Sequence, residues 1–196
     1  MSTFPLTSSQ TVGPFFAPAL LREDACRNVL TRQETAGERI RIVGHVFAGD
    51  GVPVPDAMVE IWQANAHGRY NHAADQGSAA LDPSFLGFGR SGTDEDGGYW
   101  FETVRPGAVP FDGELLQAPH ICVTVFARGL LNHVVTRLYF EDEPTNAGDP
   151  VLQSVPEGRR ETLLARREPG KTVETVVVYR FDIVLQGAGE TAFFNL

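Results

Sequence analysis

Residues 39–62 read RIRIVGHVFAGDGVPVPDAMVEIW, and this stretch decides the fold class. Its first nine residues, 39–47, alternate well enough between apolar and other side chains to predict a β-strand. Residues 49–57 are dense in Gly, Pro and Asp, which favour turns. Residues 58–64 then predict a second strand. A strand, a turn and a second strand indicate a protein built from β-sheet.

Further strands follow along the chain. They are predicted at residues 99–104, 120–127, 134–141 and 173–186, the last as one long strand. One helix is expected near 156–167, because Ser154 and Glu157 have the spacing of a capping box. Several short strands with punctuating turns and one short helix predict an all-β fold, a single β-sandwich domain with long loops over residues 38–196.

Two segments stand outside this strand pattern. Residues 1–37 are predicted to be an extended N-terminal arm, because prolines interrupt them and two aromatics, Phe15 and Phe16, follow two breakers. These aromatics dock either on the arm's own domain or on another chain, and the sequence leaves both possibilities open. Residues 65–92 form a long loop rich in Gly, Ala, Asn and Asp, and loops of this length are usually functional.

The composition argues against several classes of function. The chain has 196 residues and a formal net charge of −9 at pH 7, which disfavours nucleic acid and anionic membranes as partners. The two cysteines, Cys26 and Cys122, cannot form a multi-bridge framework and fit a reducing cytoplasm. Neither a signal peptide nor a membrane-spanning apolar run is evident. Because the chain is acidic, an anionic substrate would need a local cation.

The frame of a metal site lies in the predicted strand that begins at residue 120. Residues i and i+2 of a strand point to the same face, so a His-x-His pair in a strand is a ready chelate. Here the pair is His120 and Cys122, one imidazole and one thiol. The strand therefore carries the frame of a metal site without the full ligand set.

An ordered series of motifs resembles the intradiol ring-cleaving dioxygenases. The motifs are residues 51–57, 62–72, 82–85, 105–111, 118–122, 136–140 and 179–185. Each motif alone is moderately specific, whereas the series is highly specific and runs over nearly the whole chain. The resemblance implies a β-sandwich in which the catalytic chain of the family holds one non-haem ferric ion by two tyrosines and two histidines.

Matched to this sequence, the four ligand positions of the family are half filled. The first tyrosine falls on Tyr70 and the first histidine on His120. The second tyrosine falls on Val109, which has no lone pair, and the second histidine falls on Cys122, a soft ligand for a hard cation. The resemblance therefore implies that this chain holds no metal, and that Tyr70 and His120 have mostly structural roles.

This degenerate pattern resembles the iron-free α chain of the heteromeric members of the family. It implies a homologous β subunit that carries Fe(III), and an assembly of several αβ units. With the β subunit and O₂, 3,4-dihydroxybenzoate is expected to open between its hydroxylated carbons. The product would be 3-carboxy-cis,cis-muconate, a step of aromatic degradation in the β-ketoadipate pathway. This chain alone is expected to be inactive.

Four residues of this chain are expected to complete the substrate pocket of the β subunit. Thr11, Gly13 and Pro14 match the family's α arm and would line the mouth, where glycine allows close approach and proline fixes the bend. Arg128, in the motif FARG at 126–129, would pair with the substrate carboxylate. The alternatives are a plain docking arm and a surface arginine paired with an acid.

Two other functions remain open at the level of the sequence. A binding or scaffold module would share the turn at 51–57 and the strand at 59–64, but it would not explain the matches at 93–128 and 173–186. A self-sufficient homomeric dioxygenase would need iron at the half-filled positions. Co-purification with an iron-bearing homologue separates the α chain from a scaffold module, and turnover without a partner would support the homomeric enzyme.

Overall fold

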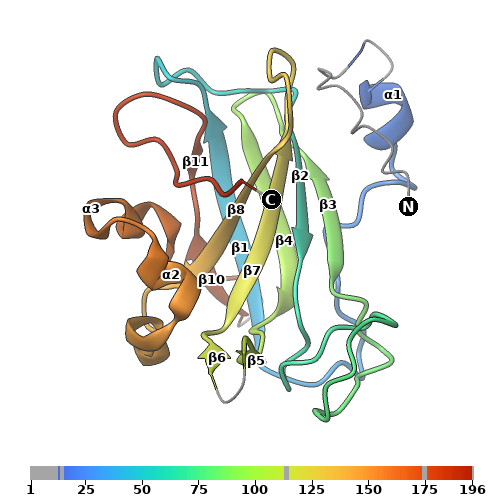
Figure 1. Cartoon of the computed structure of the whole chain (residues 1–196). Coiled ribbons are helices and arrows are strands. Elements are labelled where there is room, and N and C mark those ends of the chain that lie inside the picture. Colours follow the sequence, from blue (N-terminus) through green and yellow to red (C-terminus); the bar gives the residue numbers. More distant parts are fainter. Residues whose placement is uncertain (1–12, 14–15, 113–114, 174–175, 196) are drawn as a thin grey trace, which may run out of the picture.

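The computed structural model of the chain describes residue 13 and residues 16–112, 115–173 and 176–195. Within these ranges the chain consists mainly of strands in two facing layers, which confirms the predicted all-β sandwich (Figure 1). The strands are β1 (Arg39–Phe47), β2 (Met58–Trp62), β3 (Phe88–Gly92), β4 (Gly98–Val104), β5 (Val109–Pro110), β6 (Leu116–Gln117), β7 (His120–Phe126), β8 (Val134–Phe140), β9 (Leu164–Val173), β10 (Val176–Arg180) and β11 (Ile183–Val184).

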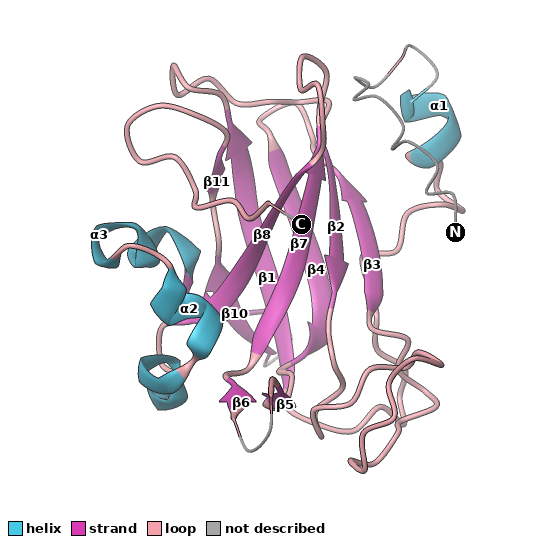
Figure 2. Cartoon of the chain, in the orientation of Figure 1, coloured by secondary structure: helices cyan, strands magenta, loops and turns pink. Residues whose placement is uncertain are grey.

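The helices of the described part are short and lie outside the two layers (Figure 2). They are α1 (Phe16–Leu20), α2 (Pro150–Ser154) and α3 (Glu157–Arg160), with the 3-10 turns η1 (Pro144–Gly148) and η2 (Glu161–Leu163). None of these helices has the length and apolar character that crossing a membrane requires.

The two layers share one edge. In the first layer β3, β2, β7 and β8 pair in that order, all antiparallel. In the second layer β4 pairs antiparallel and β10 parallel with β1. The long strand β9 pairs with β8 at its start and with β10 further along, so it joins the layers.

The predicted alternation of β1 is confirmed and builds the core. Ile40, Ile42 and Val46 are buried, and the residues that alternate with this row are partly exposed. Fully burying one such side chain contributes about 1.5–3 kcal/mol. Gly44 completes the buried row because a Cβ there would lie 1.8 Å from the carbonyl oxygen of Phe181. The backbone at Phe181 can therefore approach β1 this closely only with glycine at position 44.

The helix predicted over 156–167 differs in extent. Ser154 ends a first helix, α2, and its hydroxyl donates to the carbonyl of Val151 instead of capping a later helix. Asp149 caps α2 instead, and Leu164 already begins β9. The capping-box spacing was misleading, because Pro156 occupies the N-cap position of α3 and makes no side-chain cap.

One strand prediction and one loop prediction also need correction. The stretch 173–186 is not one strand, because Val173 ends β9 and the rest is divided between β10 and β11. Between β10 and β11 the Asp182 carboxylate accepts from the backbone of His45. The loop predicted to run to residue 92 ends earlier, since β3 occupies its last five residues. Its sequence FGRSG has little strand character, and pairing with β2 forms this strand.

The predicted arm, 1–37, is partly packed against the sandwich. Leu30 belongs to the core, and residues near it form bridges with β3 and β4. Phe16 lies against Phe126 at the end of β7, with ring centroids 6.5 Å apart, so this aromatic docks on its own domain. Phe15 lies outside the described residues. The domain boundary near residue 37 stays a prediction.

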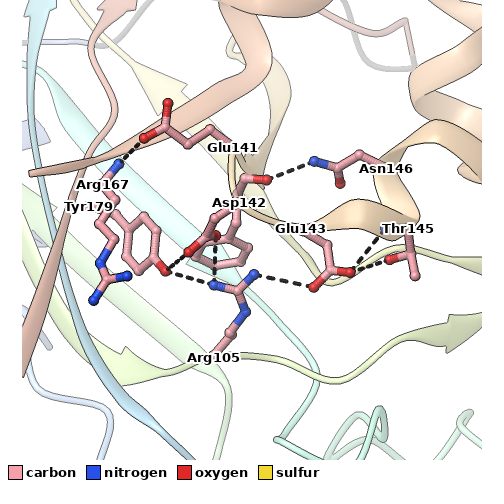
Figure 3. A network of polar contacts seen from close by, with 9 residues as sticks. Arg105, Glu141, Asp142, Glu143, Thr145, Asn146, Arg167 and Tyr179 are labelled. Atoms are coloured by element: carbon pink, nitrogen blue, oxygen red, sulfur yellow. Dashed lines mark hydrogen bonds and ion pairs between the residues drawn. The ribbon is translucent and has the colours of Figure 1, made fainter.

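A polar network joins the end of β4 to β8 and β10 (Figure 3). Arg105 donates to Asp142 at 3.0 Å, to the Tyr179 hydroxyl at 2.7 Å and to Glu143 at 3.2 Å. Its guanidinium also lies 4.6 Å from the ring centroid of Phe140. Burial raises the pKa values of the two carboxyls, but hydrogen bonds, including those from Arg105, outweigh it, so both pKa values are lowered.

We expect Arg105→Gln to lower the free energy of unfolding by about 2–3 kcal/mol at pH 7, because two partly buried carboxylates lose their cation. This corresponds to a fall in Tm of roughly 5–10 °C for a domain of this size. A carboxyl with a lowered pKa stabilises the fold above its ordinary pKa and loses this effect as pH falls. The difference should therefore shrink below about pH 4.

Thermal unfolding at pH 7 and pH 3 measures this effect. Arg166→Gln removes a charge from an exposed position on β9 and serves as the control. An equal loss of stability for Arg105→Gln at both pH values would show that packing, and not the ion pairs, accounts for the contribution of Arg105.

Candidate functional site

Three strands of the first layer form the floor of the candidate site. Trp62 on β2, Cys122 on β7 and Arg137 on β8 stand directly opposite one another, and directly opposed residues share a face of the sheet. His120 lies on the same face, opposite Tyr139, and their ring centroids are 5.7 Å apart. The core residues of β7 occupy its other face. The predicted frame of His120 and Cys122 therefore points away from the core.

The loop after β2 brings Tyr70 over this floor. The side-chain oxygen of Asn65 accepts from two backbone N–H groups of the loop, at 2.9 and 3.1 Å. Gly68 has φ +79°, and a Cβ there would lie 2.0 Å from the carbonyl oxygen of Ala108, so the turn requires glycine. Asp75 accepts from the Tyr70 backbone at 2.8 Å. The Tyr70 ring stacks on Trp62 with centroids 5.8 Å apart.

A cavity of about 470 Å³ opens beside Tyr70. Its walls include the aromatic residues Trp62, Tyr70 and His72, together with Val109, Pro110 and Gln117 from the β5–β6 hairpin. Val109 is buried, with 4% of its surface exposed, and pairs with Gln117 across the hairpin. The structure thus brings the four predicted ligand positions into one region, and we name Tyr70, Val109, His120 and Cys122 the ligand frame.

The three polar members of the ligand frame are neutral near pH 7. Burial lowers the pKa of His120 to about 4. Its Nδ1 lies 2.8 Å from the carbonyl oxygen of Ala118, which only accepts, so Nδ1 carries the proton and Nε2 keeps its lone pair. Burial raises the pKa of the Tyr70 phenol and that of the Cys122 thiol. The frame therefore supplies no negative charge.

Arg137 is the residue that sequence reasoning missed. Its Nη1 donates to the side-chain oxygen of Gln117 at 2.6 Å and approaches the Tyr139 hydroxyl at 3.4 Å. Burial raises the pKa values of Tyr70 and Cys122, and the charge of Arg137 opposes this effect. At His120, burial and the charge of Arg137 both lower the pKa. No ion pair with a carboxylate is found for Arg137 among the described residues.

Arg128 and Gly13 lie at the other end of the sheet, which we name the distal end. His120 and Phe126 are the first and last residues of β7, so at about 3.3 Å per residue they stand roughly 20 Å apart. Arg128 lies two residues after Phe126, is largely exposed and pairs with Asp56 at 2.9 Å. Gly13 accepts from the backbone of Phe16, whose ring contacts Phe126.

Figure 1 shows the same separation, with α1 beside the upper end of the strands and the β5–β6 hairpin at the lower end. Thr11 and Pro14 lie outside the described residues. Of the residues expected to bind substrate, Gly13 and Arg128 thus belong to one end of the sandwich, and the ligand frame belongs to the other.

Comparison with known proteins identifies the family. The sequence profile described as "Dioxygenase" matches residues 11–187. The protocatechuate 3,4-dioxygenase alpha chain of Burkholderia cepacia is 44% identical over 100% of both chains. The chain belongs to the intradiol ring-cleaving dioxygenases. The beta chain of protocatechuate 3,4-dioxygenase from the same species is 40% identical, over 95% of this intradiol dioxygenase and 78% of that chain.

A solved structure supports the same family fold. The dioxygenase domain of a dioxygenase carbohydrate-binding protein fusion from Streptomyces sp. SirexAA-E superposes on this intradiol dioxygenase with a TM-score of 0.62. The two are 26% identical, and the match covers 83% of this chain and 89% of that one.

The family is iron-dependent, but the ligand frame of this intradiol dioxygenase does not fit a ferric ion. Val109 offers no donor atom, and Cys122 offers a thiol whose raised pKa keeps it protonated. Among the described residues no group of three or more His, Cys, Asp or Glu side chains could hold a metal ion. Arg137 adds a positive charge beside the frame, which would repel a cation.

Proposed function

We propose that this chain is the iron-free α subunit of a heteromeric protocatechuate 3,4-dioxygenase. Its partner is a homologous β subunit that holds Fe(III), and the two form a higher assembly of αβ units in the cytoplasm. With O₂, the complex cleaves 3,4-dihydroxybenzoate between its hydroxylated carbons to give 3-carboxy-cis,cis-muconate. This chain contributes to the substrate pocket and to assembly.

The composition of the ligand frame carries this proposal. Identity with the two kinds of chain is similar, 44% with an alpha chain and 40% with a beta chain, so overall likeness separates them little. A chain that holds iron itself needs anionic donors around the cation. This frame offers Val109 and a neutral thiol at Cys122, with the charge of Arg137 beside them.

The distal end supports a role in a partner's pocket. Arg128 stands roughly 20 Å or more from the ligand frame along β7, so it cannot serve a substrate held at the chain's own frame. It is exposed, with 76% of its side-chain surface open, and its pairing with Asp56 leaves the guanidinium near the surface. A charge in this position is available to a carboxylate bound on another subunit, and we propose that it binds 3,4-dihydroxybenzoate there.

The arm completes this surface. Gly13 is exposed and lies one turn before Phe16, which docks on Phe126 at the end of β7, two residues before Arg128. We propose that Gly13, with Thr11 and Pro14, lines the mouth of the partner's pocket. Docking of Phe16 on its own domain holds the start of α1 at the distal end.

Co-expression with an iron-bearing homologous β chain tests the proposed function. The two chains should co-purify in equal amounts, and the complex should cleave 3,4-dihydroxybenzoate with O₂ uptake. The lone full-length chain should show neither turnover nor tyrosinate-to-iron absorbance after incubation with ferric iron. Stoichiometric iron and turnover in the lone chain would contradict the proposal and support a homomeric enzyme, whereas a chain that never associates would support a scaffold module.

A further inference from the structure

Beside the ligand frame, the positively charged side chain of Arg137 lies close to a cavity with aromatic walls. Gln117 lines the cavity, and its side-chain oxygen holds one nitrogen of Arg137 at 2.6 Å. Tyr70 lines the cavity as well, and the charge of Arg137 lies close enough to act on its phenol. The guanidinium thus lies behind the cavity wall, in contact with Gln117. A guanidinium has five N–H donors, and Nη1 alone is used by the two contacts described for Arg137.

This cation is not neutralised locally. Two other partly buried arginines on or next to the strands have carboxylates: Arg90 pairs with Glu60 at 2.6 Å and Arg105 with Asp142 at 3.0 Å. Arg137 instead faces amide, phenol and thiol groups, and no ion pair involving it is found in the described part of the chain. Because a partly buried charge is stabilised most by an opposite charge, the site favours an anion.

The walls of the cavity determine which anion fits. Trp62, Tyr70 and His72 present aromatic surfaces, and Val109 and Pro110 add apolar ones. The volume of about 470 Å³ lies within the usual range for small-molecule sites, about 300–1,000 Å³. A flat ring between these walls, with a carboxylate directed toward the guanidinium, would satisfy both the apolar surfaces and the unused donors.

We propose that the cavity next to Arg137 is a second binding site, specific for a small aromatic carboxylate, in which the guanidinium binds the carboxylate group beside Gln117. The site lies at the opposite end of the sandwich from Arg128. It uses residues of this chain alone, so it does not depend on the proposed function.

Asp75 is the one acidic side chain on the walls described for the cavity. Its two carboxylate oxygens accept from the backbones of Tyr70, at 2.8 Å, and Gly77, at 2.7 Å. It is therefore committed to holding the loop. The ligand carboxylate is expected at the Gln117 side of the cavity, where Arg137 lies, and the ring is expected over Trp62.

Tryptophan fluorescence of the full-length chain tests this proposal. The chain has two tryptophans, and Trp100 lies elsewhere, with Arg41 over its ring. In a Trp100→Phe background, titration with 4-nitrobenzoate should quench Trp62 saturably, with a Kd of about 0.1–1 mM for a ligand of this size. Arg137→Gln should weaken binding about 10–100-fold, and Arg166→Gln should leave it unchanged.

A second variant covers the case in which Arg137→Gln fails to fold. Gln117→Glu keeps the size of the side chain, pairs internally with Arg137 and should abolish quenching. Two further probes test the chemistry: 4-nitrobenzamide, which lacks the charge, should bind at least about tenfold more weakly, and inorganic phosphate at equal concentration should not displace 4-nitrobenzoate.

Equal binding of the amide, full binding to the Gln117→Glu variant, or displacement by phosphate would each overturn the proposal. Absence of saturable quenching in a chain that still forms an active complex with its partner would overturn this inference alone. Saturable, Arg137-dependent quenching in a chain without such a partner would support the inference and count only against the proposed function.

Discussion

Arg128→Gln is expected to lower kcat/KM of the αβ complex for 3,4-dihydroxybenzoate by about 10–100-fold, because a charge-assisted hydrogen bond contributes about 1.5–3 kcal/mol. The loss should appear mainly in KM, since the carboxylate is bound in the ground state as well as in the transition state. Turnover of catechol, which has no carboxylate, should change little. Steady-state O₂ uptake with both substrates measures the effect.

The fold should tolerate this substitution. Arg128 pairs with Asp56 at the surface, with 76% of its own side chain exposed, and such pairs contribute about 0–1 kcal/mol. Arg128→Lys should recover part of the activity because it keeps the charge but not the planar fork. The control Arg166→Gln should behave as wild type. An equal loss with catechol would place the role of Arg128 in assembly and not in carboxylate binding.

Iron binding to this chain is expected to need three changes and not two. Val109→Tyr with Cys122→His restores the donor types of the ligand frame, but it leaves the guanidinium of Arg137 beside the frame. Two tyrosinate ligands would leave the bound ferric ion with a net charge of about +1, and a unit charge about 5 Å away then costs on the order of 3 kcal/mol at an effective dielectric constant of about 20. The double variant should therefore bind ferric iron weakly at most.

Adding Arg137→Gln to the double variant should raise iron affinity about a hundredfold, because a cost of about 3 kcal/mol corresponds to about two powers of ten in affinity. Iron content and tyrosinate-to-iron absorbance of the purified full-length variants measure the difference. Arg166→Gln in the same double background controls for net charge. Equal affinity of the double and triple variants would show that Arg137 has no part in excluding the metal.

The sequence predicts the parts of this structure that depend on local pattern. The alternation at residues 39–47 predicts β1, and the i, i+2 rule places His120 and Cys122 on one face. The strands β7 and β8 lie within one residue of the predicted ranges. In each case side chains that face the core alternate with side chains that do not, so the strand can be recognised from its sequence.

Elements that form only because they pair with other strands were not predicted from the sequence. The sequence of β3, FGRSG, is ordered by pairing with β2 and not by its own composition. The two ends of β9 pair with strands of different layers, which local composition does not reveal. The Ser154 spacing mimicked a capping box, although the preceding helix uses Ser154 as its last residue.

The same limit explains why Arg137 was missed. The motif at residues 136–140 contributed to the family resemblance, but nothing local relates position 137 to position 122. The register of β8 on β7 places Arg137 opposite Cys122, and the β5–β6 hairpin supplies the amide of Gln117 that holds it. Alternation along residues 134–141 predicts on which face of its own strand Arg137 lies. It does not predict which residue of the neighbouring strand lies opposite Arg137.

The central claim is that this chain completes a pocket on its partner and holds no iron of its own. A structure of the αβ complex with bound 3,4-dihydroxybenzoate tests it most directly. We predict iron on the β subunit only, with the Arg128 guanidinium of this chain within hydrogen-bonding distance, about 3 Å, of the substrate carboxylate. Iron bound among Tyr70, His120 and Cys122, with Arg128 still paired to Asp56, would contradict the account.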